Sequence, residues 1–239
     1  CIITDPETHR VLDILPKRTA FTLNRYLRSF PKEERNNVEL FVSDMWKPFQ
    51  ESASFYFPNA TRIIDKYHWV RQMTWAFENV RKSEQRKFGK QYRIYFKHSR
   101  KLLLKHFDTL DEDTKRQVLI MLDTSVPLSR SHFYKEELQK ILKTNEVFEK
   151  KEKFKRWIDY TENCGIIQFE KCTDTYRHWL TEILASMDTD ITNGFTEGCN
   201  NKIKVLKRNA YGYRNFRRFR NRILHIFSHK QLNKDQAAA

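Results

Sequence analysis

The sequence is poor in the residues that interrupt regular secondary structure. Only 5 glycines and 6 prolines occur in 239 residues. Folds such as β-sandwiches need many turns, so this scarcity favours a helix-rich fold. The four cysteines form neither a CxxC pair nor a regular series of spacings, so they indicate neither a zinc module nor a disulfide framework.

A second absence concerns membranes and secretion. No apolar run approaches the ~20 residues of a membrane-spanning helix. No signal peptide opens the chain. We therefore expect a soluble, cytoplasmic protein with no membrane partner, whose thiols stay reduced.

What the sequence does contain is positive charge and aromatic residues. The formal net charge is +15, hydrophobic residues make up 39% of the chain, and aromatic residues make up 14%. This hydrophobic content is enough for a folded core and excludes a disordered tail. The excess of positive charge implies an anionic partner, and nucleic acid is the partner that we expect.

The first 66 residues carry the pattern of a mixed sheet covered by helices. Two β-type runs flank a turn and predict a hairpin. Two later strands each stop at an aspartate, Asp44 and Asp65, and α/β sheets place functional groups at such strand ends. The predicted elements are a hairpin over 1–15, a helix over 18–30, a strand over 38–43, a helix over 45–56 and a strand over 61–64.

Residues 67–187 have an almost wholly helical pattern, which predicts a large all-α insertion. Residues 188–232 then form the second part of the sheet domain and end in a basic helix over 215–227. The expected fold class is α/β, with helices dominating overall. Apolar residues recur at helical spacing over 68–81, 91–104, 113–122, 131–142, 146–160 and 172–187.

One stretch, over 193–208, predicts a helix that combines an acid with several cations. The helix is expected to begin near residue 196, with Glu197 in its first turn and Asn201, Lys204 and Arg208 following on the same face. A carboxylate at one end and cations along the rest suit a metal ion and a phosphate backbone. A plain amphipathic helix would have the same spacing, so both interpretations stay open.

Three acids, Asp44, Asp65 and Glu197, are candidates for a shared metal site. Mg²⁺ and Mn²⁺ prefer hard oxygen ligands, and two ions ~3.5–4 Å apart can activate an attacking oxygen and stabilise a leaving one. Each acid could instead cap a helix or a turn. Asp65 and His68 allow either a pair of metal ligands or an N-cap with a histidine in the first helical turn.

Basic residues gather in two clusters, and aromatic residues interleave the second. Such a surface suits contacts to phosphates with stacking on exposed bases, although a solvated charged surface is the plainer alternative. The first cluster is Arg81, Lys82, Arg86, Lys87, Lys90 and Arg93, and the second is Lys202, Lys204, Lys207, Arg208, Arg214, Arg217, Arg218, Arg220 and Arg222.

Two kinds of chemistry lack the residues they require. Cys199 has no adjacent base that would activate its thiol, which argues against covalent catalysis. No glycine-rich phosphate-binding motif occurs, so nucleotide hydrolysis is not indicated.

Four blocks of the sequence stand in a particular order. They are Ser43-Asp44-Met45-Trp46-Lys47-Pro48-Phe49, then Phe57-Pro58-Asn59-Ala60, then Ile64-Asp65-Lys66-Tyr67-His68-Trp69-Val70-Arg71, then Asn193-Gly194-Phe195-Thr196-Glu197-Gly198-Cys199-Asn200-Asn201-Lys202-Ile203-Lys204. In this order they resemble the ISL-three-like group of bacterial insertion-sequence DDE transposases. The resemblance covers nearly the whole chain, and the combination is specific although each block alone is weak.

The resemblance implies an RNase H-like core that is interrupted by the helical insertion. It implies that Asp44 and Glu197 are the second and third catalytic acids and hold Mg²⁺ or Mn²⁺. Lys204, seven residues after Glu197, would be the catalytic basic residue that holds a phosphate near the cut. Asp65 and His68 match a D-x-x-H element, for which a supporting role is expected.

The resemblance also implies a further acid, on a strand that precedes the hairpin. We find no candidate for it, since Asp5 and Asp13 occupy turn and later-strand positions. We therefore expect that this acid and an amino-terminal DNA-binding region lie upstream of Cys1. The two-metal site would then be complete only when that acid is present.

The expected function is that of a transposase catalytic domain, which cleaves DNA and transfers strands during transposition with Mg²⁺ as cofactor. The partners would be the double-stranded DNA of transposon ends and target, in a bacterial cytoplasm, with a homodimer as one option. Two alternatives stay open: a non-catalytic DNA-binding or assembly fragment, and an RNase H-like nuclease. The residues expected to contact DNA are Lys202, Lys204, Lys207, Arg208, Arg214, Arg217 and Arg218.

Overall fold

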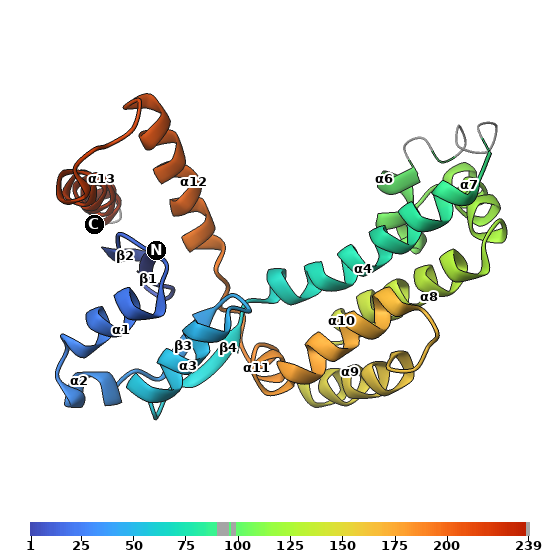
Figure 1. Cartoon of the computed structure of the whole chain (residues 1–239), viewed down its shortest axis with the longest axis horizontal. Helices are drawn as coiled ribbons and strands as arrows, with labels where there is room; N and C mark the ends of the chain where they lie inside the picture. Colours follow the sequence, from blue (N-terminus) through green and yellow to red (C-terminus); the bar gives the residue numbers. More distant parts are fainter. Residues whose placement is uncertain (90–95, 97–98, 238–239) are drawn as a thin grey trace. The chain divides into compact units, whose positions relative to one another are not determined.

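The computed structural model describes residues 1–89, 96 and 99–237, with side chains up to residue 228. The chain divides into two compact units, shown in Figure 1. We call Cys1–Asp65 together with Thr189–Ala239 the sheet unit, and Lys66–Asp188 the helical unit.

The sheet unit begins with a β-hairpin, as the sequence predicts. Strand β1 (Ile2–Asp5) pairs antiparallel with β2 (Arg10–Ile14), and Asp5 is opposite Arg10. The Asp5 carboxylate accepts the backbone N–H groups of Glu7 and Thr8 at 2.9 and 3.2 Å. An aspartate that satisfies nearby backbone donors stabilises a tight turn.

The second pair of strands is parallel. Strand β3 (Leu40–Ser43) pairs in register with β4 (Thr61–Ile64), and α3 (Lys47–Tyr56) connects them. Parallel strands end at the same edge of a sheet. Asp44 and Asp65, the residues that follow the two strands, therefore lie at one edge.

The described residues do not form the single mixed sheet of RNase H type that the sequence predicts. In the part of the chain that is described, the hairpin and the parallel pair form two separate two-stranded sheets. No described strand hydrogen-bonds to both β1 and β3, and a continuous sheet would need such a strand between them. The coarser expectation of a helix-dominated α/β protein with small sheets is confirmed.

Helices cover both strand pairs of the sheet unit. Side chains of α1 and α3 pack together around Leu15, Leu23 and Leu27. Helix α12 contacts β1, and α13 packs on β2, where the Arg220 guanidinium pairs with Asp13. In addition to α3, the helices of this unit are α1 (Ala20–Arg28), α2 (Lys32–Asn36), α12 (Gly194–Asn209) and α13 (Phe216–Ala237).

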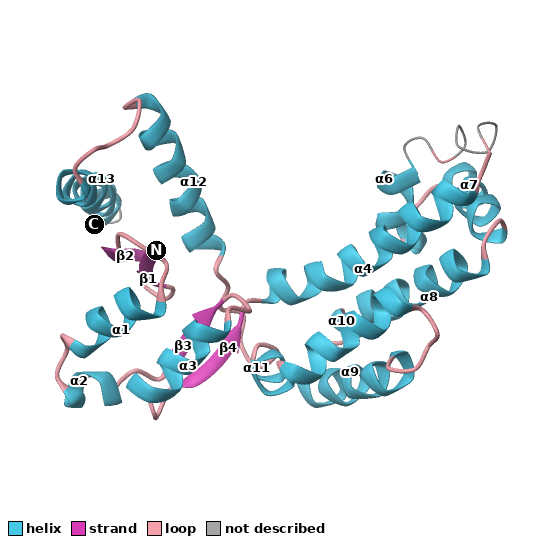
Figure 2. Cartoon of the chain, viewed as in Figure 1, coloured by secondary structure: helices cyan, strands magenta, loops and turns pink. Residues whose placement is uncertain are grey.

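The helical unit has no strand among its described residues (Figure 2). Helices α4, α8, α9 and α10 form a four-membered bundle in which each helix contacts two of the others. The helices are α4 (Lys66–Lys87), α6 (Ser99–Leu104), the 3₁₀ helix η1 (Phe107–Thr109), α7 (Glu112–Asp123), α8 (Val126–Leu142), α9 (Val147–Thr161), α10 (Ile167–His178) and α11 (Leu180–Ala185).

Several predicted helices of this unit differ in extent from the observed ones. Helix α4 continues to Lys87, beyond the predicted end at residue 81, and α8 begins at Val126, before the predicted start at residue 131. The segment over 172–187 begins earlier, at Ile167, and breaks at Trp179 into α10 and α11. Of the helix expected over 91–104, α6 is described, and most of the remainder lies outside the described residues.

Large aromatic side chains fill the core of the helical unit. Trp69, Phe77, Phe154 and Tyr176 are all buried. The Tyr176 hydroxyl donates to the Trp69 carbonyl at 2.7 Å, so the polar atom of a buried tyrosine has a partner. No helix in the described part of the chain is long and apolar enough to cross a membrane.

Candidate metal centre and basic helix

Glu197 lies in the first turn of α12, where the sequence predicts it. The helix begins at Gly194, two residues before the predicted start, with Asn193 as its N-cap residue. The Thr192 hydroxyl accepts the Gly194 N–H at 3.3 Å and satisfies one of the free donors of the first turn.

Three contacts fix the beginning of α12 to the rest of the sheet unit. The Asp65 carboxylate accepts the Asn193 N–H at 2.9 Å. The hydroxyls of Thr4 and Thr196 are 2.6 Å apart, which ties α12 to β1. The rings of His9 and Phe195 lie 5.2 Å apart between centroids. The position of Glu197 is thus set by groups that are remote in sequence.

The same arrangement brings Asp65 and Glu197 together. Each offers a carboxylate oxygen, and these two oxygens lie within 4.8 Å of each other. Asp65 is only 2% exposed, whereas Glu197 is half-buried. A buried carboxylate at a helix amino terminus is stabilised by the helix dipole and by the N–H groups there.

This donor set fits a hard divalent cation. Mg²⁺ and Mn²⁺ are bound by a few carboxylate oxygens together with water. His68 follows Asp65 by three residues in sequence, in the first turn of α4, and its imidazole is a nitrogen ligand by type. Imidazole nitrogen is tolerated by Mn²⁺ more readily than by Mg²⁺.

Asp44 has a different partner. It directly follows β3, beside Asp65 at the edge of the parallel pair, and both of its oxygens accept from the Arg18 guanidinium at 2.9 Å. Arg18 also lies over the Trp46 and Phe49 rings, at 4.8 and 5.0 Å from their centroids. Among the described residues, the group whose ligand atoms are close enough to share a metal ion contains Asp65 and Glu197 but not Asp44.

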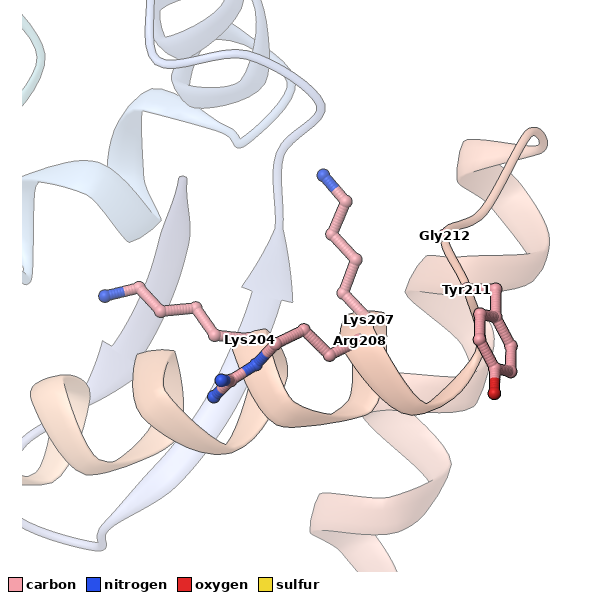
Figure 3. Close-up of a pocket in the computed structure, with 5 residues that line it drawn as sticks. All are labelled: Lys204, Lys207, Arg208, Tyr211 and Gly212. Atoms are coloured by element: carbon pink, nitrogen blue, oxygen red, sulfur yellow. The ribbon is translucent and has the colours of Figure 1, made fainter.

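The exposed face of α12 is basic, as the spacing from Glu197 predicts. Asn201, Lys204 and Arg208 are all exposed. Towards the end of the helix lies an open hollow of ≈ 660 Å³ (Figure 3), and Tyr211 beside it is fully exposed. The residues that line the hollow are Lys204, Lys207, Arg208, Tyr211 and Gly212.

Of the residues expected to contact DNA, Lys202 differs from the others. Its Nζ is buried and lies 4.7 Å from the centroid of the Phe227 ring. It therefore contributes to the packing of α12 on α13 and does not present a free ammonium to solvent. The other six side chains are exposed: Lys204, Lys207, Arg208, Arg214, Arg217 and Arg218.

The Cys199 thiol on α12 is not placed as a nucleophile. Its side chain is buried, and burial raises the pKa of the thiol, although the Lys202 ammonium opposes part of this rise. A thiol with a raised pKa stays protonated near neutral pH and reacts slowly.

Several residues of the site carry no signal in the sequence alone. Arg18 neutralises Asp44 from a position 26 residues earlier, and Thr4 reaches Thr196 across 192 residues. Asn193 acts through its backbone N–H, which any residue other than proline would supply. The positions of the acids at strand and helix ends, and the resemblance of the blocks that contain them to DDE transposases, are the sequence signals that indicate this region.

Paired carboxylates and a basic helix have the chemistry that suits a divalent cation and nucleic-acid phosphates. The family whose model matches residues 1–223 is described as transposase. The chain belongs to this family, the ISL3 group of DDE transposases.

Curated relatives agree with this family. The chain is 26% identical over 216 residues to the transposase for insertion sequence element IS1001 of Bordetella parapertussis. It is 21% identical over 236 residues to the transposase for insertion sequence element IS1557 of Mycobacterium tuberculosis. Each match covers 89% of this chain and 53% of the relative, so the chain spans about half the length of these proteins. No solved structure matches the chain significantly.

Proposed function

We propose that this chain carries catalytic residues of an insertion-sequence transposase. The reaction would be divalent-metal-dependent hydrolysis of a DNA phosphodiester, followed by attack of the freed 3′-hydroxyl on target DNA. The observation that carries the proposal is the meeting of Asp65 and Glu197, whose carboxylate oxygens lie within 4.8 Å although the residues are far apart in the chain. Membership in the transposase family supports it.

We assign metal ligation to Asp44 and Glu197, with Asp65 and His68 as supporting residues. Asp65 holds the start of α12 through Asn193, which places Glu197, and its carboxylate is also close enough to share the cation. Asp44 would join after exchanging Arg18 for the cation, because both are positive partners of the same carboxylate. A bound Mg²⁺ or Mn²⁺ would supply Lewis acidity and an activated water.

The basic face of α12 would hold the DNA. Lys204 lies seven residues after Glu197, which is about 10 Å along a helix. Its ammonium can therefore bind a phosphate near the scissile one, while Arg208 and Lys207 bind phosphates further along the same strand. The partner would be double-stranded DNA, at the transposon ends and at the target.

We further propose that a strand from outside these residues completes an RNase H-like sheet. Within the described chain, β1 and β3 each pair with a strand on one side only. An additional strand between them would join the hairpin to the parallel pair. An acid at its end would reach the edge where Asp44 and Asp65 lie and would allow a two-metal site.

One observation favours a second function, that of a non-catalytic DNA-binding or assembly module. Asp44 is already neutralised by Arg18, as a structural carboxylate would be. Such a module would bind DNA with a steep salt dependence but would not cleave it. A nuclease on the same fold would cleave DNA without joining strands.

The proposal is tested by Glu197→Gln in a full-length transposase that contains this chain. Gln keeps the size of the side chain but is a poor ligand for a hard cation, so strand cleavage should fall at least ~10³-fold while DNA binding persists. Glu152→Gln on α9 is a matched control and should cleave normally. Unchanged cleavage by Glu197→Gln would refute the assignment. Cleavage by the parent protein without strand joining would indicate the nuclease.

A further inference from the structure

One face of α4 carries exposed aromatic rings where a helix surface usually has polar side chains. Tyr67 and Trp75 are 54% and 46% exposed. Arg71 lies between them in sequence, four residues from each, so the three side chains share one face of the helix. The bundle core uses the opposite face, which buries Trp69, Phe77 and other residues.

Arg71 connects the two rings. Its guanidinium carbon lies 4.4 Å from the Trp75 ring centroid and 5.7 Å from that of Tyr67. No carboxylate among the described residues forms an ion pair with Arg71. Cation–π attraction holds the guanidinium and the two rings together, and we call these three exposed side chains a ladder.

The same face continues with one neutral polar residue and two cations, and it has no acid. Asn79, Lys82 and Arg86 are exposed at the spacing that extends the line from Trp75. The two acids of α4, Glu78 and Glu84, are buried, and each pairs with a cation. The line from Tyr67 to Arg86 is about 28 Å long, given the rise of a helix. We call Tyr67, Arg71, Trp75, Asn79, Lys82 and Arg86 the α4 stripe.

We propose that the α4 stripe binds single-stranded DNA. An unpaired base stacks on the ladder of Tyr67, Arg71 and Trp75, while Lys82 and Arg86 hold phosphates of the same strand. Aromatic stacking with nearby cations is the chemistry by which proteins hold unpaired strands, since duplex DNA keeps the faces of its bases covered. None of the six residues of the α4 stripe is among those that we assign to the metal centre.

Binding is measured by fluorescence anisotropy with the whole chain, using a labelled oligonucleotide and the duplex of the same sequence. EDTA is present throughout, so the outcome does not depend on the metal site. Trp75→Ala should weaken single-strand binding about tenfold and change duplex binding less than about twofold. Phe148→Ala is the matched control, because Phe148 is exposed on α9 outside the stripe, and it should change neither affinity.

Arg71→Lys separates stacking from charge, because it keeps the charge and removes the planar guanidinium. It should weaken single-strand binding by about threefold or more and leave duplex binding unchanged. Circular dichroism confirms that each variant is folded. Equal losses for single strand and duplex, or no loss in Trp75→Ala, would overturn the proposal. Tighter binding of RNA than of DNA of the same sequence would overturn the assignment to DNA.

Discussion

Each of the two units of the molecule is stabilised internally in a different way. The helical unit has a continuous aromatic core around Trp69, Phe154 and Tyr176. The sheet unit has two small sheets and a core of Leu15, Leu23 and Leu27, and single polar contacts fix its functional helix. The difference teaches that stability and site geometry have separate sources here. Packing supplies the first, and a few long-range hydrogen bonds supply the second.

Buried ionic groups in the helical unit illustrate the contrast. Lys135 is almost completely buried and donates to the carbonyls of Leu103 and Lys105 at 2.9 Å, while it also pairs with Glu136. These contacts cap the end of α6 against α8. Charged groups that satisfy backbone carbonyls in this way specify packing and are not free for chemistry.

The largest expected effect is the loss of stability when a core leucine is replaced by alanine, and it should differ between the two units. Leu138→Ala in α8 should lower the free energy of unfolding by about 3–5 kcal/mol, because Leu138 is fully buried and its truncation leaves a cavity in the core. Leu23→Ala in the sheet unit should cost only about 2–3 kcal/mol, since part of its surroundings is half-buried. Urea unfolding measures both variants. If Leu23→Ala lowered the free energy of unfolding as much as Leu138→Ala or more, the proposed difference between the two cores would be wrong.

The next effect is the pH dependence of the helical unit. Burial, followed by the charges of Lys135 and His106, lowers the pKa of His132 from 6.5 to about 3, and these outweigh the Glu136 carboxylate 3.6 Å away. Between pH 6.5 and 3 the unfolded chain therefore binds a proton that the folded chain does not. The neutral His132 side chain therefore makes its full contribution to the free energy of unfolding above pH 6.5. This contribution declines as the pH falls and is smaller by about 2 kcal/mol at pH 5.

Replacement of His132 by glutamine tests this dependence. Unfolding of His132→Gln and of the parent chain is compared at pH 8 and pH 5, and the variant should lose less stability on acidification. If the parent instead gained stability at pH 5 relative to the variant, His132 would be protonated in the fold through Glu136, and our sign would be wrong.

A smaller loss of stability is expected for Thr196→Val, which should reduce metal affinity more clearly than it destabilises the fold. Thr196→Val removes the hydroxyl contact with Thr4 and should cost about 1 kcal/mol. Because this contact positions the first turn of α12, Mn²⁺ affinity should fall by about threefold or more, measured by electron paramagnetic resonance. Thr74→Val removes a hydroxyl in the helical unit and is the matched control. Equal Mn²⁺ affinity in both variants would contradict the positioning role.

The smallest expected effect on stability is at Arg18. The pair with Asp44 is partly exposed, so Arg18→Gln should change the free energy of unfolding by less than about 1 kcal/mol. The same change should tighten Mn²⁺ binding, because it frees the Asp44 carboxylate for the cation. Weaker Mn²⁺ binding in this variant would show that Asp44 is not a ligand.

Local sequence signals predicted most elements of the fold. Short β-type runs and turn residues predicted the hairpin and both parallel strands, and helical spacing predicted α7 and α9 nearly to the residue. The break at Trp179 and the short α2 were missed, because neither has a glycine or a strong cap to mark it. The separation into two sheets depends on strand pairing over long distances, which no local pattern encodes.

The candidate site could be predicted from the sequence only in part. The positions of Asp44 and Asp65 at strand ends and of Glu197 in the first turn of α12 identify these acids as candidates. Which acids meet depends on contacts such as those of Arg18 and Thr4, which join residues remote in sequence. A spacing of four residues between Tyr67, Arg71 and Trp75 was visible in the sequence, but only the exposed fractions distinguish this stripe from a core face.

The central claim is that a cation binds Glu197 at the place where the Glu197 and Asp65 carboxylates meet. Cleavage of the backbone by hydroxyl radicals, generated by Fe²⁺ bound in place of Mg²⁺ or Mn²⁺, tests this claim most directly, because cuts occur only near the bound ion. We expect two sets of fragments from the whole chain, one cut near residue 65 and one near residue 197, and both should disappear together in Glu197→Gln. Cuts confined to one of these regions, or cuts that persist in the variant, would contradict the account.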